Sequence, residues 1–137
     1  MLAEASLRFS LPESFELAVQ SVCGSMRKHG MRVAGQLDIS RRLERSLAML
    51  LEPCTVLFVL PDPAALSAPF IQPQAAVFLP LHVVISGNGN QCEVQIQNRI
   101  RPGRGVAPPK PYGPVVEAQR QLSEAIQAIA LRTSLLA

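Results

Sequence analysis

Few residues in this chain have the chemistry of a catalytic centre, and their spacing gives no familiar motif. The 137 residues include ten acids, two histidines and three cysteines. Asp62 lies between two prolines, and His82 lies in an apolar run. In an enzyme, these two side chains could meet at the mouth of a pocket and act as an acid–base pair. The chain has no glycine-rich phosphate loop, no His-Glu-x-x-His segment and no Gly-x-Ser-x-Gly turn. We therefore expect no catalytic residues, and we keep an enzyme with a small pocket near His82 as an alternative.

The three cysteines give no indication of a metal or redox site. Cys23, Cys54 and Cys92 are far apart in the sequence, and no two of them have the spacing of metal ligands. Each lies in an apolar pattern, where a cysteine behaves as a small buried hydrophobic residue. We expect neither a bound metal nor a cofactor.

Residues 98–114 form a basic, proline-rich loop. The loop holds five of the twelve prolines, three glycines and no acid. Removing its four basic residues leaves 9 basic against 10 acidic residues, so only this loop accounts for the net charge of +3. Aromatic residues are 4% of the chain, which argues against base stacking on single-stranded nucleic acid. A solvated loop is the simplest interpretation; the alternatives are weak, salt-dependent nucleic-acid binding or an extended peptide docked on a partner protein. Its candidate contact residues are Arg99, Arg101, Arg104, Lys110 and Tyr112.

Hydrophobic periodicity predicts the elements around these residues. Period-two or continuous apolar runs predict strands over 7–11, 31–38, 55–60, 75–85 and 92–97. Helical spacing predicts helices over 15–29 and 115–136, and a short extra helix near 40–51. The length fits a single domain over residues 1–137. The order predicts an α+β fold, in which an antiparallel five-stranded sheet packs against two main helices.

The third and fourth predicted strands are apolar on both faces. An antiparallel sheet normally leaves one face in water, so something must cover the second face near Val56, Phe58, Val83 and Ile85. We expect a second copy of the chain, in a homodimer, and keep the chain's own segment 61–76 as the alternative. A sheet covered in this way can also enclose a small apolar ligand. The candidate ligand-binding residues are Phe58, Asp62 and His82.

No stretch offers about 18 consecutive apolar residues, so we expect no membrane insertion. The first residues, Met1 to Ala5, carry an early acid and lack the pattern of a signal peptide. A cytoplasmic location is the default expectation.

Several segments resemble the "domain of unknown function 302" family. They are the helix opening Ser14-Phe15-Glu16-Leu17-Ala18-Val19, the run 56–64, the segment 78–84 and the closing helix. The resemblance implies a fold similar to the TATA-box-binding-protein half-domain, β-α-β4-α, usually seen as a dimer. Many members carry cysteines where this chain has Leu60 and Leu81, so any thiol chemistry of the family does not carry over. The loop 98–114 is also longer than usual. Because the family has no assigned function, the expected role is a non-enzymatic binding or interaction module.

Overall fold

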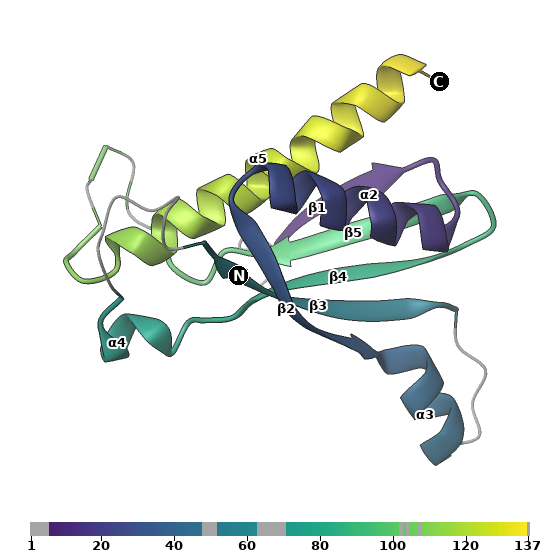
Figure 1. Cartoon of the computed structure of the whole chain (residues 1–137), viewed down its shortest axis with the longest axis horizontal. Coiled ribbons are helices and arrows are strands. Elements are labelled where there is room, and N and C mark those ends of the chain that lie inside the picture. Colours follow the sequence, from purple (N-terminus) through teal and green to yellow (C-terminus); the bar gives the residue numbers. More distant parts are fainter. Residues whose placement is uncertain are drawn as a thin grey trace.

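The computed structural model describes residues 6–47, 52–62, 71–101, 103, 105–106 and 108–136. These residues form an α+β fold, as the sequence predicts (Figure 1). The strands are β1 (Ser6–Leu11), β2 (Met31–Asp38), β3 (Cys54–Pro61), β4 (Leu81–Asn88) and β5 (Gln91–Gln97). The helices are α2 (Phe15–Lys28), α3 (Ile39–Leu47), α4 (Pro73–Ala76) and α5 (Gly113–Leu136).

The five strands form one sheet in the order β1-β5-β4-β3-β2, so β4 is the central strand. All neighbours are antiparallel. The turn between β4 and β5 contains Gly89, whose φ of +67° suits a residue without a side chain. Because side chains alternate between faces along each strand, the register fixes which residues share a face.

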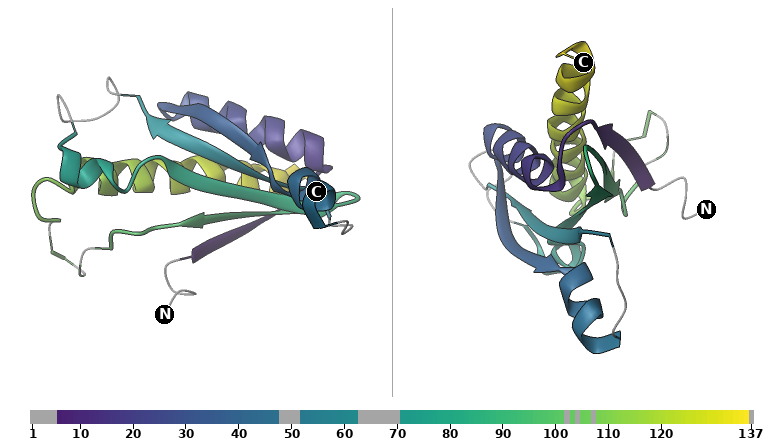
Figure 2. Two further views of the ribbon diagram at one scale, coloured as in Figure 1. Left: turned by 90° about the horizontal axis from the view of Figure 1, so that it is seen from below. Right: turned by 90° about the vertical axis from the view of Figure 1, so that its right-hand side faces the viewer.

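Helices α2 and α5 cover one face of the sheet, and α3 lies on the other side (Figure 2). The two covering helices are joined in the core, where the Ser25 hydroxyl donates a 2.6 Å hydrogen bond to the carbonyl of Ala125. Ser14 caps α2 by accepting a hydrogen bond from the Leu17 amide. The buried sheet residues below the helices are Leu11, Met31, Leu57, Val59, Leu81, Val83, Ile85, Cys92, Val94 and Ile96.

The uncovered side, which we call the open face, corrects one prediction. Val83 and Ile85 are fully buried beneath the helices, whereas Val56 and Phe58 point to the open face and are half-buried. The four residues therefore do not form one patch. The sequence alone does not show which of these residues share a face, because β3 and β4 carry apolar residues at both odd and even positions. Of the segment 61–76, predicted as an alternative cover, residues 63–70 lie outside the described residues.

The segment before β4 also differs from the prediction. The sequence predicts a strand from residue 75, but residues 73–76 form α4 and β4 begins at Leu81. Pro73 favours the first turn of a helix, and the amide of Phe78 then bonds to the carbonyl of Ala75 in a turn. Pro80 directly precedes β4, where its missing N–H interrupts no ladder.

The short helix near 40–51 is present as α3, which continues directly from β2. The Asp38 carboxylate accepts hydrogen bonds from the Arg41 amide and the Ser40 hydroxyl and so starts the helix. Figure 1 shows α3 projecting away from the body of the molecule. Among the described helices, none combines the length and apolar character needed to cross a membrane.

Candidate functional site

The open face carries an apolar stripe along β3 and its neighbours. Cross-strand pairs place its members side by side, since Val56 is opposite both Leu37 on β2 and Val84 on β4. Leu60, at the end of β3, is 38% exposed. Large apolar side chains grouped on a surface mark a contact site. We define the apolar stripe as Leu37, Val56, Phe58, Leu60 and Val84.

Phe58 is the centre of this stripe. Its ring lies over Gly35, where an added Cβ would be 3.6 Å from the Phe58 ring. The same ring meets the imidazole of His82 edge to face, with ring centroids 5.2 Å apart and planes at 89°. The structure therefore brings two predicted site residues, Phe58 and His82, into contact on the open face.

The other half of the open face is polar. Arg8 on β1 and Glu93 on β5 form an ion pair with a nitrogen–oxygen distance of 3.6 Å. Both side chains are well exposed, so the pair adds little stability. Gln95 lies opposite Val84 and marks the border between the polar half and the apolar stripe.

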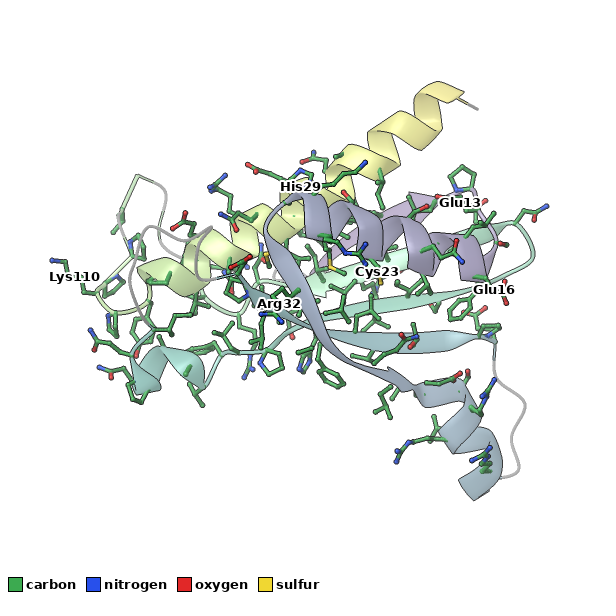
Figure 3. All side chains as sticks on the ribbon, viewed as in Figure 1. Glu13, Glu16, Cys23, His29, Arg32 and Lys110 are labelled. Atoms are coloured by element: carbon green, nitrogen blue, oxygen red, sulfur yellow. The ribbon has the colours of Figure 1, made fainter. Side chains whose placement is uncertain are left out.

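Asp62, the third predicted ligand residue, lies in a different place. Its amide donates a 2.8 Å hydrogen bond to the carbonyl of Gly30. The residue lines a groove of about 410 Å³ between α2 and β2, and Figure 3 shows Cys23 and Arg32 on this part of the molecule. His82 instead lines a cavity of about 20 Å³ with Phe78, Pro80, Leu81, Gln97 and Arg99. The structure does not bring Asp62 and His82 together in one pocket.

The basic loop meets the sheet at Arg99. The Arg99 guanidinium lies 5.4 Å from the centre of the Phe78 ring, a cation–π contact. The Tyr112 ring packs edge to face with the Phe78 ring, with ring centroids 5.9 Å apart. Two residues predicted for the loop therefore share one aromatic anchor, Phe78, which sequence reasoning missed because it placed residue 78 in a strand.

A buried glutamine fixes the same part of the loop. Gln119 on α5 is 4% exposed. Its side-chain carbonyl accepts from the Ile100 amide at 3.1 Å, and its amide donates to the Ile100 carbonyl at 2.7 Å. The loop therefore leaves β5 along one defined path.

The remaining predicted loop residues do not join this cluster. Arg101 and Lys110 are exposed. Figure 3 shows Lys110 at the far end of the loop, pointing away from the fold. Arg104 lies outside the described residues. The loop thus offers separate cations, with one of them held on an aromatic ring.

A second groove, of about 330 Å³, is lined mainly by apolar side chains. It lies where the start of β2 and the end of β3 approach the segment around α4. One cation, Arg32, stands among these side chains. The other lining residues are Val33, Ala34, Leu60, Pro61, Ile71 and Leu79.

The cysteines are unpaired, and only Cys92 is fully buried. Burial raises the pKa of each thiol; for Cys23 the cation of Arg27 opposes the rise. Thiols with raised pKa values are poor nucleophiles and poor metal ligands. In the part of the chain that the structure describes, no three acids, histidines or cysteines gather as metal ligands would.

Comparisons with known proteins agree with the fold described above. The family model described as "Domain of unknown function DUF302" matches residues 7–129. Among solved structures, the chain is similar to that of an uncharacterized conserved protein DUF302 from Bacillus stearothermophilus, with 14% sequence identity and a TM-score of 0.63. That match covers 90% of this chain and 96% of the other, and at this identity it concerns the fold alone. No curated protein matches. Because the family model spans most of the sequence, the chain belongs to the DUF302 family.

Proposed function

We propose that this protein is a non-enzymatic homodimeric interaction module, in which the open faces of two copies pack together. One observation carries the proposal: the apolar stripe runs along β3 and β4 on the side of the sheet that no described helix covers. A sheet that is apolar on both faces needs a packed layer on each side, and α2 and α5 supply only one of them (Figure 2). A second copy supplies the missing layer and removes both stripes from water.

The arrangement of the stripe supports self-association. Phe58 is held by Gly35 and His82, so it presents a preset surface and loses little freedom on binding. Aromatic residues in such central positions contribute most to interface energies. The polar residues of β1 and β5 then form the rim, which is the common anatomy of a protein interface.

Two further observations support the non-enzymatic part of the proposal and a cytoplasmic site of action. Asp62 and His82 line separate pockets, so the acid–base pair considered from the sequence lacks its geometry. Three unpaired thiols suit a reducing compartment such as the cytoplasm.

A small apolar ligand is the second candidate, favoured by the groove of about 330 Å³. Its volume lies at the lower end of the range for small-molecule sites. The lining of Val33, Leu60 and Leu79 suits a short alkyl chain, and Arg32 suits an acidic head group. The ligand class would be a short-chain carboxylic acid.

Sedimentation velocity tests the dimer. We expect the wild type to sediment as a dimer at micromolar concentration, and Phe58→Glu to sediment as a folded monomer, because two carboxylates would be buried across the axis. The control is Val77→Glu, which adds the same charge at a residue that is 69% exposed and outside the stripe. A monomeric wild type, or a Phe58→Glu protein that still dimerises, would overturn the proposal.

Titration calorimetry with octanoate tests the ligand site. We expect octanoate to bind and octanol to bind more weakly, since only the acid can pair with Arg32. Ala34→Trp should fill the groove and abolish binding, while Val77→Trp should leave it unchanged. Equal heats for octanoate and for buffer would remove this candidate.

A further inference from the structure

Helix α3 follows the edge strand β2 at the same end of the sheet as a polar, acidic groove, which spans β4, β5 and β1. The register shows this directly: Asp38 pairs with Thr55, Ser86 pairs with both Cys54 and Glu93, and Glu93 pairs with Ser10. Cys54, Ser86, Glu93 and Ser10 form a row across β3, β4, β5 and β1, and Asp38 lies opposite Thr55, the residue next to Cys54. The row begins beside the start of α3, where the Cys54 amide donates a hydrogen bond to the Ser40 hydroxyl, and it ends at β1.

The groove along this row is lined by two acids. It has a volume of about 350 Å³, and its carboxylates are those of Glu52 and Glu93, the second of which also pairs with Arg8 on β1. Two more acids, Glu13 and Glu16, stand close enough to act on the thiol of Cys92, whose pKa is raised first by burial and then by these charges. Ser10, Ser86 and Gln91 complete the polar lining. We call this the acidic groove.

Helix α3 has the opposite charge. It carries three arginines and one glutamate, and its arginines Arg41, Arg42 and Arg45 are all exposed. Arg41 pairs with Asp38 beside it. Among the side chains that the structure describes, none forms an ion pair with Arg42 or Arg45. Leu43, on the same helix, is 37% exposed.

The position of α3 puts these charges on the side of the open face. Figure 2 shows α3 on the side of the sheet opposite α2 and α5, projecting beyond the strands. Among the residues described, α3 touches mainly its neighbour β3. A helix with cations and an exposed leucine, held away from its own core, is placed to contact another molecule.

Two-fold symmetry then relates α3 to the acidic groove. When two copies pack through the same face, the axis lies in the interface plane. An axis parallel to the strands and between β3 and β4 brings the two apolar stripes together. It also lays β2 of one copy over β5 of the other, with matching ends aligned. The helix that continues β2 therefore arrives at the groove beside Glu93 of the second copy.

We propose that α3 of each copy binds in the acidic groove of the other, with Arg42 and Arg45 facing Glu52 and Glu93. The inference rests on the proposed dimer and assigns its orientation and partner contacts. The apolar stripes supply the affinity, and the two reciprocal charged contacts select this orientation among the possible face-to-face arrangements. Because both contacts lie near the surface, added salt weakens them.

Charge reversal tests the arrangement. The double variant Arg42→Glu, Arg45→Glu should dimerise about tenfold more weakly than the wild type at 50 mM NaCl, and the difference should shrink at 0.5 M NaCl. The control is Arg101→Glu with Lys110→Glu, which changes the net charge equally on exposed residues of the basic loop. We expect this control to dimerise as the wild type does.

A mixing experiment distinguishes a specific contact from general repulsion. A second protein carries Glu52→Lys and Glu93→Lys in the groove. Each variant alone meets like charges, but a heterodimer of the two variants has matched charges at both contacts. Native mass spectrometry of an equimolar mixture should show heterodimer well above half of all dimers. The matched mixture combines the groove variant with Arg101→Glu, Lys110→Glu, which has the same net charge as the α3 variant. A heterodimer share no higher than in that matched mixture overturns the inference.

The outcome for α3 is separable from that for the dimer itself. If Phe58→Glu is monomeric but the arginine variant dimerises like the wild type, the interface stands and the inference about α3 is wrong. If Phe58→Glu remains dimeric, the open face is not the interface and both proposals fail.

Discussion

Replacing the buried Gln119 tests how much a single side chain of α5 stabilises the path of the basic loop. Its two hydrogen bonds to the backbone of Ile100 join the basic loop to α5 at 3.1 and 2.7 Å. Gln119→Leu keeps the size of the side chain but leaves the Ile100 amide and carbonyl without these partners. A net loss of about 1 kcal/mol for each neutral hydrogen bond gives a destabilisation of about 2 kcal/mol. Ile100 is half-buried, so water limits any larger penalty.

Urea denaturation followed by circular dichroism measures this free energy of unfolding. Gln127→Leu is the matched control, because Gln127 is an exposed residue of the same helix and should change stability by less than about 0.5 kcal/mol. Trypsin gives a local readout: cleavage between Arg99 and Ile100 should be faster in Gln119→Leu, since the loop opens more often. Equal stability of the two leucine variants, with equal cleavage rates, would refute the role assigned to Gln119.

Two other predictions concern a helix start and a hairpin. Hydrogen bonds from the Arg41 amide and then from the Ser40 hydroxyl lower the pKa of the Asp38 carboxyl below its usual 3.8. The ionised carboxylate therefore stabilises the folded protein fully above pH 3.8, and this stabilisation is lost as the pH falls through the lower pKa of the folded state. Asp38→Asn should therefore be less stable than the wild type at pH 7, with the gap in melting temperature closing in acid; a constant gap would contradict this. Gly87→Ala should cost about 3 kcal/mol, because the new Cβ would press on the backbone of β5, 2.7 Å from the nearest Cα. Gly89→Ala, with open space around it but a φ of +67°, should cost only about 1 kcal/mol in the same urea titration.

Much of the fold could be predicted because local signals agree with the final structure. Ser14 and Gly30 bracket α2 as a cap and a positive-φ terminus, and alternation identifies β2 and β5. Residues 75–79 misled the prediction because they are apolar and lie next to a true strand. A proline at the first helical position was the available signal that a helix begins there.

The candidate site was only partly predictable. Phe58 and His82 could be named individually, but their contact depends on the pairing of β3 with β4, which periodicity does not reveal when both faces are apolar. Arg99 and Phe78 come together only through the path of a long loop, and that path depends on Gln119 from another helix. Such contacts arise from tertiary packing and leave no local pattern.

The interruption in β2 limits how these chains can accumulate. β2 is an outer strand of the sheet, and its pairing with β3 shifts between Val33 and Gly35, a bulge that bends the strand. At the opposite border, β1 is only six residues long. A bent edge strand and a short edge strand are both poor templates for the addition of another strand. These two edges therefore protect the protein against fibril growth. Crowding should therefore not drive the chains into strand-by-strand polymers.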